Sequence, residues 1–267
     1  MNKKGKFFII FMLIWSLLPL IWGIRTSLLS NNDLYISPLK YFGTDMSSYR
    51  ELFFGKIADK FFMATKNSFK TSILGTIAGI VITIPCAYVF SKYEFILKKT
   101  LYVLIILVLA IPFYTIMIPL YRLAVDYSMI DTQIILIIIY VCGYSPMSFL
   151  IMKLYFDAVP IELEEIGMIE GASKLRRFFT AARLIVPGIV AASLIMFFNI
   201  WSSFVVPLIF SMKKTKPLTI FITEFVGKSS VNYSIMTTAG IVTLIIPIIL
   251  VCMFNRYFID GIITISK

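Results

Sequence analysis

Six long apolar runs constrain this chain more than any other feature of its sequence. Each is close to or beyond the length of about 20 residues that an α-helix needs to cross the hydrocarbon core of a bilayer. The runs cover approximately residues 7–24, 71–91, 101–121, 133–152, 184–210 and 235–254. A composition of 59% hydrophobic residues and a mean hydropathy of +0.91 are too apolar for a soluble domain. The sequence therefore predicts an all-α, polytopic membrane protein with six transmembrane helices.

The first run follows Lys3, Lys4 and Lys6, as the apolar region of a secretory signal peptide would. It is long, contains the bulky Trp15 and Trp22, and is not followed by a small-residue cleavage site, so we interpret it as an uncleaved span. Basic residues beside the first helix favour the cytoplasmic side. We therefore expect a cell-membrane protein with both termini in the cytoplasm. The outer connections would be 25–70, 122–132 and 211–234, and the inner ones 93–99 and 153–183.

The net charge of +11 raises the question of a nucleic-acid partner. The 25 Lys and Arg residues are scattered among short loops, so we expect them to meet lipid head groups and expect no nucleic acid. The absence of histidine removes the commonest general base and zinc ligand. Cys86, Cys142 and Cys252 lie in apolar runs without metal-ligand spacing. We expect them to be core thiols and expect no metal site.

Prolines are concentrated in the apolar runs. Proline removes a backbone hydrogen bond and bends a helix, which a membrane tolerates where a neighbour or a water-filled cavity satisfies the freed carbonyl. Bent spans suit a moving transport pathway, although proline is frequent in membrane helices generally. The prolines concerned are Pro19, Pro85, Pro112, Pro119, Pro146, Pro187, Pro207 and Pro247.

Ionisable residues are nearly absent from the centres of the runs. A proton pump, an ion-coupled secondary carrier or a membrane-embedded enzyme would usually need one there, so the sequence argues against these classes. Neutral polar and aromatic side chains do occur, and they suit a polyhydroxylated ligand such as a sugar. They suit ordinary hydrogen bonds between helices equally well. The candidate pathway and substrate residues are Tyr114, Thr115, Asn199, Trp201, Ser202 and Ser203.

The connection between the fourth and fifth runs is unusually charged. Its stretch EEIGMIEGASKLRRFF holds three carboxylates and three basic side chains in a chain that is only 15% charged. Pro160 favours a helix start, and carboxylates in the first turns suit the positive end of the helix dipole. These carboxylates are Glu162, Glu164 and Glu165.

The same connection has the pattern of two short helices. Leu163, Ile166 and Ile169 recur at every third position and form one apolar stripe. Gly171 is suited to end this first helix in a left-handed conformation, and Ser173 to cap a second one. We therefore predict a compact helix, glycine turn and helix on the cytoplasmic face.

Here the sequence resembles a known family. Glu165-Ile166-Gly167 followed after three residues by Gly171-Ala172-Ser173 is similar to the Glu-Ala-Ala-x-x-x-Gly loop of the membrane subunits of binding-protein-dependent ABC importers. The likeness extends over most of the chain and points to carbohydrate permeases of the maltose type, specifically the smaller, six-span member of the pair. Its other markers are Asn67-Ser68, Ala87-Tyr88, Pro119-Leu120-Tyr121, Ile130-Asp131-Thr132, Pro160, Phe178, Trp201-x-x-Phe204-x-x-Pro207-Leu208, Pro217-Leu218-Thr219 and Arg256-Tyr257-Phe258-x-x-Gly261.

Several positions depart from the family's pattern. Ile166 and Gly167 replace the two alanines of the loop, and Glu170 replaces the usual aspartate before the glycine. The Leu-Pro that normally follows is missing, with Leu184 in the place of the proline, and the Asn-Glu of the fifth span is Ser202-Ser203. These departures concern the ATPase contact and the identity of the sugar.

The resemblance implies a mechanism and a set of partners. In such permeases the loop helix docks in a groove of a cytoplasmic ATPase, where its glutamate pairs with a basic side chain. The partners would be a second homologous permease subunit, two ATPase subunits, an extracellular or periplasmic sugar-binding protein, and membrane lipid. The chain would be no enzyme and need no cofactor, because the partner subunit binds ATP. The ATPase-coupling residues would be Glu165, Ile166, Ile169, Gly171 and Ala172.

We expect residues 1–70 to form an N-terminal span with an outer loop. Residues 71–260 would form the permease core, with the coupling loop at 160–180. Gly227-Lys228-Ser229 looks like the end of a phosphate-binding loop, but Ile222 stands where a glycine is needed, so we expect no phosphate binding there.

Alternative functions remain open from the sequence. The nearest is an ABC permease for another solute, such as a polyamine or phosphate. A secondary carrier is a weaker alternative, because the coupling residues it needs are missing from the span centres. A purely structural scaffold predicts that uptake survives charge reversal of Glu165.

Overall fold

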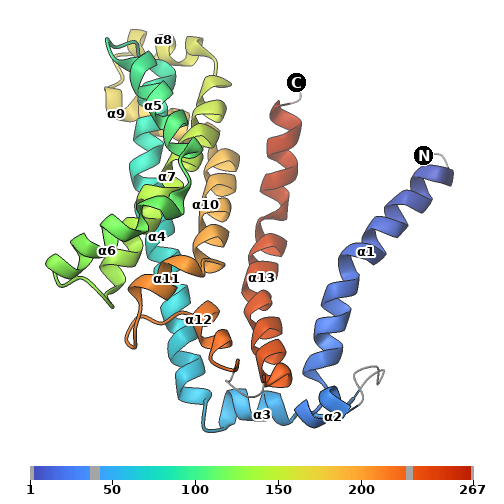
Figure 1. Ribbon diagram of the computed structural model, residues 1–267. Coiled ribbons are helices and arrows are strands. Elements are labelled where there is room, and N and C mark those ends of the chain that lie inside the picture. Colours follow the sequence, from blue (N-terminus) through green and yellow to red (C-terminus); the bar gives the residue numbers. More distant parts are fainter. Residues whose placement is uncertain (1–2, 37–42, 227–230, 266–267) are drawn as a thin grey trace. The chain divides into compact units, whose positions relative to one another are not determined.

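The computed structural model describes residues 3–36, 43–226 and 231–265, with side chains for all of these except 3–4 and 255–265. Every regular element in this part is a helix, apart from one isolated bridge between Val226 and Val231 (Figure 1). The all-α prediction is confirmed. Gly227-Lys228-Ser229 lies outside the described residues. The chain forms two compact units, Met1–Thr65 with Pro217–Ile248 and Lys66–Lys216 with Ile249–Lys267. Two helices contribute to both units, α4 (Ala58–Lys92) and α13 (Tyr233–Ile265).

The first unit is held by a small buried centre. The Phe61 ring of α4 lies 5.9 Å from the Phe221 ring. The Ser48 and Ser234 hydroxyls are 2.6 Å apart, and the Ser234 hydroxyl donates to the Leu29 carbonyl at 2.6 Å. The other elements of this unit are α1 (Lys3–Ser27), α2 (Asn31–Ile36), α3 (Ser47–Phe54) and α12 (Leu218–Thr223).

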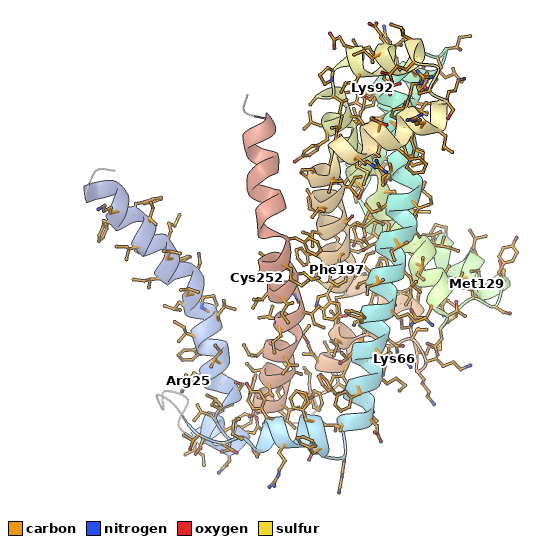
Figure 2. All side chains as sticks on the ribbon, turned by 180° about the vertical axis from the view of Figure 1, so that it is seen from behind. Arg25, Lys66, Lys92, Met129, Phe197 and Cys252 are labelled. Carbon is orange, nitrogen blue, oxygen red and sulfur yellow. The ribbon has the colours of Figure 1, made fainter. Side chains whose placement is uncertain are left out.

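The second unit is organised around α7. This helix packs against α5, α10 and α11, so it is the central helix of the unit. In Figure 2, Lys66 and Lys92 mark the two ends of the part of α4 that belongs here. The elements are α5 (Lys98–Ala110), η1 (Phe113–Ile116), α6 (Met117–Asp126), α7 (Gln133–Asp157), α8 (Ile161–Ile169), α9 (Lys174–Leu184), α10 (Val186–Trp201) and α11 (Val205–Phe210).

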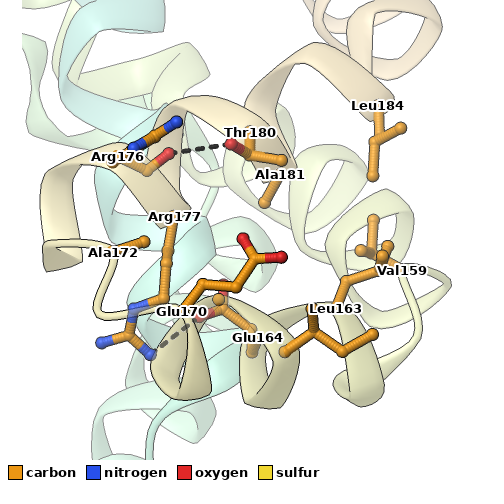
Figure 3. A pocket seen from close by; sticks show the side chains of 12 residues that line it. Val159, Leu163, Glu164, Glu170, Ala172, Arg176, Arg177, Thr180, Ala181 and Leu184 are labelled. Carbon is orange, nitrogen blue, oxygen red and sulfur yellow. Dashed lines mark hydrogen bonds and ion pairs between the residues drawn. The ribbon is translucent and has the colours of Figure 1, made fainter.

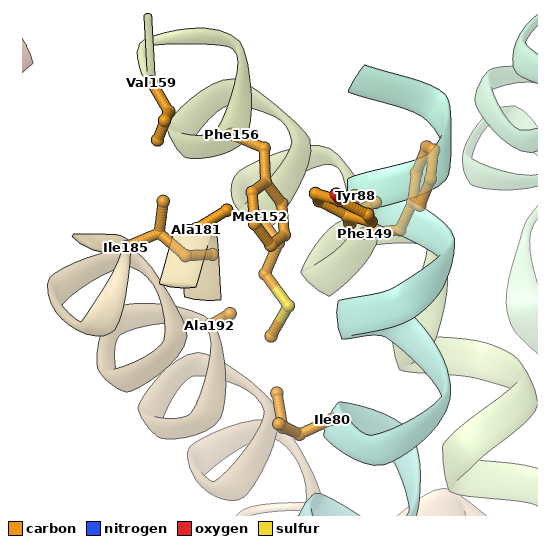
Figure 4. Close-up of a cluster of buried hydrophobic side chains, with 10 residues drawn as sticks. Ile80, Tyr88, Phe149, Met152, Phe156, Val159, Ala181, Ile185 and Ala192 are labelled. Carbon is orange, nitrogen blue, oxygen red and sulfur yellow. The ribbon is translucent and has the colours of Figure 1, made fainter. Parts of the chain in front are cut away.

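Two buried clusters hold the second unit together. The first joins α4, α7, α9 and α10 and forms the base on which α9 rests (Figure 4). Its members are Ile80, Ala87, Tyr88, Phe149, Met152, Phe156, Val159, Ala181, Ile185 and Ala192. The second joins α6, α7, α10 and α11 around Met117, Ala124, Ile135, Leu136, Ile139, Tyr140, Met196, Ile200, Val206 and Phe210.

The helices agree with the predicted number of membrane crossings when bent pairs are counted as single crossings. Four helices are long and apolar enough to cross by themselves, Gly5–Ser27, Ala58–Lys92, Gln133–Asp157 and Tyr233–Phe254. Two bent pairs bring the number to as many as six, Lys98–Ala110 with Phe113–Asp126 and Lys174–Leu184 with Val186–Trp201.

The third and fifth predicted spans are not continuous helices. The third turns by 91° at Pro112, because proline drives the preceding residue out of the helical conformation, and Ile111 is extended with ψ 124°. The fifth predicted span is interrupted after Trp201, where the Ser202 hydroxyl donates to the Phe198 carbonyl at 2.6 Å. Such serine bonds compete with the backbone ladder of a helix.

The second predicted span lies inside a longer helix, and the expectation for the cysteines was wrong. The helix that contains residues 71–91 already begins at Ala58, because lysines in its first turns lower the hydropathy of that part without preventing a helix. The three cysteines are exposed and do not pack in a core. In a membrane protein, apolar groups have no need to face inwards, since lipid is as apolar as the interior.

Candidate functional site

The predicted helix, glycine turn and helix forms as expected at one end of the second unit. We call residues 160–184, with α8 and α9, the α8–α9 hairpin. Pro160 precedes the first residue of α8, and Gly171 has a φ of +74° in the left-handed region. The Ser173 hydroxyl caps α9 by accepting the Arg176 amide at 3.3 Å. These local features follow directly from residue type.

α8 leaves its apolar side chains largely exposed. Ile166 and Ile169 are 51% and 86% exposed, and Leu163 is 43% exposed. Helices of globular proteins usually bury such a stripe, so a stripe left uncovered marks a surface that another molecule can cover.

The buried side chain of α8 is instead a carboxylate. Glu164 is 4% exposed, and it is the one buried residue among the nine of this helix, all of which are described. The Tyr88 hydroxyl of α4 donates to Glu164 Oε1 at 2.6 Å. Arg177 Nη1 of α9 donates to Glu164 Oε2 at 3.2 Å, and Arg177 is itself only 9% exposed. A buried ion pair therefore ties α8 to α9, and a charge-assisted hydrogen bond from a neutral hydroxyl ties α8 to α4.

A cavity of about 220 Å³ lies between the two arms of the hairpin. Figure 3 shows Glu164 and Arg177 joined by a dashed line on one side of it, with Leu163, Val159 and Leu184 on the other. The cavity is thus apolar at one end and charged at the other.

The predicted coupling residues are all at least partly accessible, and Ile166 and Ala172 also line the cavity. Glu165 is exposed, and within the described residues it has no recorded hydrogen bond or ion pair. Ala172 is half-buried beside the cavity. The predicted coupling residues therefore share one accessible part of the hairpin.

Sequence reasoning missed Glu164, Arg177 and Tyr88. A signal for the first two was present, because they carry opposite charges and are equally distant in sequence from the Glu170–Gly171 turn, which joins their two helices. Tyr88 on the distant α4 had no comparable signal.

A second group of candidate residues lies where the third and fifth predicted spans break. The Phe113 ring lies 6.0 Å from the Tyr144 ring, which stacks on Tyr140 at 6.0 Å with an interplanar angle of 11°. The Ser203 hydroxyl lies within hydrogen-bonding reach of both tyrosine hydroxyls. Tyr114, which is 56% exposed, adjoins the Phe113 ring at 5.9 Å. We call Tyr114, Tyr140, Tyr144 and Ser203 the tyrosine cluster.

Most of the other predicted pathway residues use their polar side chains in hydrogen bonds to the nearby backbone. Thr115, Asn199 and Ser202 donate to backbone carbonyls three or four residues earlier in the chain, at 2.7, 2.8 and 2.6 Å. Trp201 is buried and stacks on Phe197 at 5.7 Å. Its Nε1 has no hydrogen-bond partner among the described residues.

The opposite end of the second unit carries a fixed loop. The Asp131 carboxylate accepts the amides of residues 212–215 at 2.9–3.1 Å, together with the Thr215 hydroxyl at 2.9 Å. Asn67 Nδ2 donates to the Lys214 and Lys216 carbonyls of the same loop at 2.9 and 3.0 Å. Burial raises the pKa of Asp131, but the backbone donors together outweigh it and hold that pKa well below its ordinary value of 3.8. We call this arrangement the Asp131 clamp.

Residues 75–263 match the family described as "Binding-protein-dependent transport system inner membrane component", which is most of the chain. The chain belongs to this family. The permease is therefore the multi-pass, inner-membrane part of a binding-protein-dependent ABC transporter, which also contains ATPase subunits and a binding protein. It is not itself catalytic and carries no cofactor, since ATP is handled by the ATPase partner. The family resemblance predicted from the sequence is confirmed.

Curated relatives share much of the permease. The sulfoquinovosyl glycerol transport system permease protein of Agrobacterium fabrum is 25% identical over 254 residues, covering 94% of this chain and 88% of the relative. The galactooligosaccharides transport system permease protein of Bacillus subtilis is 34% identical over 170 residues, covering 63% of this chain and 60% of the relative.

The fold also has a solved counterpart. It matches a chain in the crystal structure of a bacterial ABC transporter involved in the import of the acidic polysaccharide alginate. The TM-score is 0.78 at 19% identity, over 97% of this chain and 98% of that one. The all-helical fold is thus shared with a chain of that transporter.

Proposed function

We propose that this permease forms part of the translocation pathway for a carbohydrate, which an external binding protein delivers and an ATPase dimer drives. A second homologous permease completes the pathway. The proposed ATPase contact is supported chiefly by the exposure pattern of α8. This helix buries the charged Glu164 and leaves an apolar stripe exposed beside Glu165. Two curated relatives named for sugar-derived solutes support a carbohydrate.

The α8–α9 hairpin has the properties of a docking element. A helix presenting apolar side chains at every third or fourth position fits into a groove of a partner. Ile166 and Ile169 supply the apolar contacts, and Glu165 supplies a carboxylate that is free to pair with a basic side chain. Gly171 and Ala172 shape the turn behind this surface.

Basic residues beside the hairpin are compatible with the cytoplasmic side, which the lysines before the first span favour. At this end of the unit, Lys92 Nζ donates to the Val159 carbonyl at 2.5 Å, and Lys98 pairs with Glu94 at 2.6 Å. Lys153 pairs with Asp157 at 2.7 Å. Basic residues beside short connections favour the cytoplasmic side, so both termini of the permease are assigned to the cytoplasm as well.

The tyrosine cluster supports a carbohydrate over a charged solute. Stacked aromatic rings and neutral hydroxyls match the apolar faces and hydroxyls of a sugar ring. A polyamine would favour a carboxylate in the pathway, and phosphate would favour an arginine. Neither occurs among Tyr114, Tyr140, Tyr144 and Ser203. The candidate residues Thr115, Asn199, Trp201 and Ser202 lie near the same helix breaks.

The decisive experiment compares Glu165→Lys with Glu94→Lys in the complete complex, reconstituted in proteoliposomes. Glu94 is a matched control, because its side chain is 87% exposed at the same end of the unit. We expect Glu165→Lys to remain in the membrane, to retain less of the ATPase subunits through purification and to lose uptake by tenfold or more, about 1.4 kcal/mol. Glu94→Lys should behave as wild type.

Uptake at the wild-type rate by Glu165→Lys would contradict the docking role. The solute class is tested in the same vesicles with radiolabelled oligosaccharides, a polyamine and phosphate. Uptake of the polyamine or phosphate in place of the sugars would refute the carbohydrate assignment without affecting the docking role.

A further inference from the structure

We propose that Glu164 is the anchor through which movement of the α8–α9 hairpin reaches the transmembrane helices. This inference rests on the proposed function, because it assumes that an ATPase moves the hairpin. It assigns separate roles to two neighbouring glutamates. Glu165 contacts the partner, whereas Glu164 holds α8 to its own chain.

The attachment of α8 to the second unit depends on charge because its apolar groups are not buried against that unit. Leu163 and Ile166 are 43% and 51% exposed and line the cavity beside α9, and Ile169 is 86% exposed, so they contribute little packing between α8 and its neighbours. The buried contact of α8 is the Glu164 carboxylate, whose two oxygens are both used, one by α4 and one by α9. Removal of this carboxylate therefore breaks the buried polar contacts of α8 with both neighbours at once.

The surroundings of Glu164 make this attachment specific. A buried carboxylate is costly unless it is paired and hydrogen-bonded. Arg177 supplies the positive charge, Tyr88 supplies a short neutral donor, and Lys92 adds an attractive charge nearby. A hydrophobic side chain at position 164 would satisfy none of these groups.

Tyr88 carries the connection into the body of the permease. Its ring lies 5.2 Å from Phe178 of α9 and 5.5 Å from Phe156 of α7, in both cases nearly edge to face. A shift of α8 would thus pull on the Tyr88 hydroxyl through Glu164, and the Tyr88 ring would pass the shift to α7 and α9. Lys92, one turn further along α4, holds the Val159 carbonyl just before α8 begins.

Gly167 fits the same arrangement. A Cβ atom at this position would lie 3.0 Å from Arg177 Cγ and 3.1 Å from Arg177 Cδ. The missing side chain therefore leaves room for the stem of Arg177, which would have to shift by a few tenths of an ångström beside an alanine. This gives a structural reason for a glycine where the family motif usually has alanine.

The test uses the complete complex with its ATPase and binding-protein subunits in proteoliposomes. Three quantities are measured for each variant, namely the ATPase retained on purification, ATP hydrolysis and solute uptake. For Glu164→Gln we expect wild-type retention and continued hydrolysis, because the outer face with Glu165 is unchanged. Solute transported per ATP should fall about tenfold, which corresponds to about 1.4 kcal/mol. Tyr88→Phe, which removes only a hydroxyl, should lower the same ratio by a smaller factor.

A charge exchange separates the ionic link from a general loss of structure. Glu164→Arg and Arg177→Glu should each lower the transport ratio, and the double variant should regain part of it.

An unchanged ratio in both Glu164→Gln and Tyr88→Phe would overturn the anchor role. Loss of ATPase retention in Glu164→Gln would also overturn it, since Glu164 would then shape the docking face. If Glu164→Gln fails to insert, Tyr88→Phe alone decides, and a wild-type ratio rejects the proposal. Failure of the Glu165→Lys experiment would instead reject the docking role.

Discussion

Glu164 and Glu165 are adjacent, identical in type and opposite in environment. One helical residue rotates the side chain by about 100°, which is enough to place Glu164 between α4 and α9 and Glu165 on the outer surface. Sequence alone identified the second, because it occupies the motif position. The first is recognisable only when Tyr88 and Arg177 are seen beside it.

Gly171 provides a prediction that depends only on its backbone. Its φ of +74° is unfavourable for any residue with a Cβ, although no atom lies within 4 Å of where that Cβ would be. Gly171→Ala should destabilise the hairpin by about 1–2 kcal/mol. The measurement is the melting temperature of the purified complex, supported by proteolysis within residues 160–184.

Gly240 is the matched control for this substitution. It lies within α13 and also has open space around its Cβ position, but without a left-handed backbone. Gly240→Ala should leave the melting temperature unchanged or raise it slightly, because alanine is the better helix former. Equal melting temperatures for the two variants would show that the turn at Gly171 does not require a left-handed residue.

At the scale of elements, the family markers found in the sequence prove to be places where distant segments meet. Asn67 and Asp131 hold the loop after α11, and Tyr88 of α4 packs against Phe178 of the hairpin. The sequence identified these positions as family markers, but it did not predict which residues they contact. Hydrogen bonds between residues far apart in the chain leave no periodic signal, so pattern reasoning had no means of finding them.

The Asp131 clamp predicts a pH dependence. The folded state lowers the pKa of Asp131, so its stabilisation is fully present above the unfolded pKa of about 3.9 and is lost as the pH falls through the lower, folded value. Asp131→Asn should have a lower melting temperature than wild type at pH 7, because an amide nitrogen would face the amide donors of the loop. The difference should shrink below about pH 4.

Asp126→Asn serves as the control for this comparison. Asp126 is exposed at the end of α6, close to Asp131 in sequence. It should melt at the wild-type temperature at both pH values. A difference between Asp131→Asn and wild type that stays constant down to the most acid condition would contradict the role of the ionised carboxylate.

At the scale of the whole molecule, the permease by itself leaves much apolar surface uncovered. It has an exposed apolar stripe on α8, and none of the most apolar 18-residue stretch of α1 is buried. Lipid covers such surfaces within the bilayer, whereas the stripe on α8 is the surface that the proposed function assigns to the ATPase.

The assigned orientation predicts where single cysteines react. With Cys86, Cys142 and Cys252 replaced by alanine, Ile169→Cys on the hairpin should be labelled by a membrane-impermeant maleimide only from the cytoplasmic side. Lys213→Cys, exposed in the loop of the Asp131 clamp, should be labelled only from outside. Both sites belong to the second unit. The reverse pattern, or labelling of both from one side, would refute the topology.

The sequence by itself determined the class of this protein, because apolar length and local turn chemistry are properties of contiguous residues. The six runs, the helix ends at Pro160 and Ser173 and the left-handed Gly171 were all predictable in this way. Only the tertiary structure decided the 91° bend at Pro112 and the burial of Glu164 between α4 and α9. A bend angle and an ion pair depend on what packs against a segment, and that information is distributed over residues far apart in the chain.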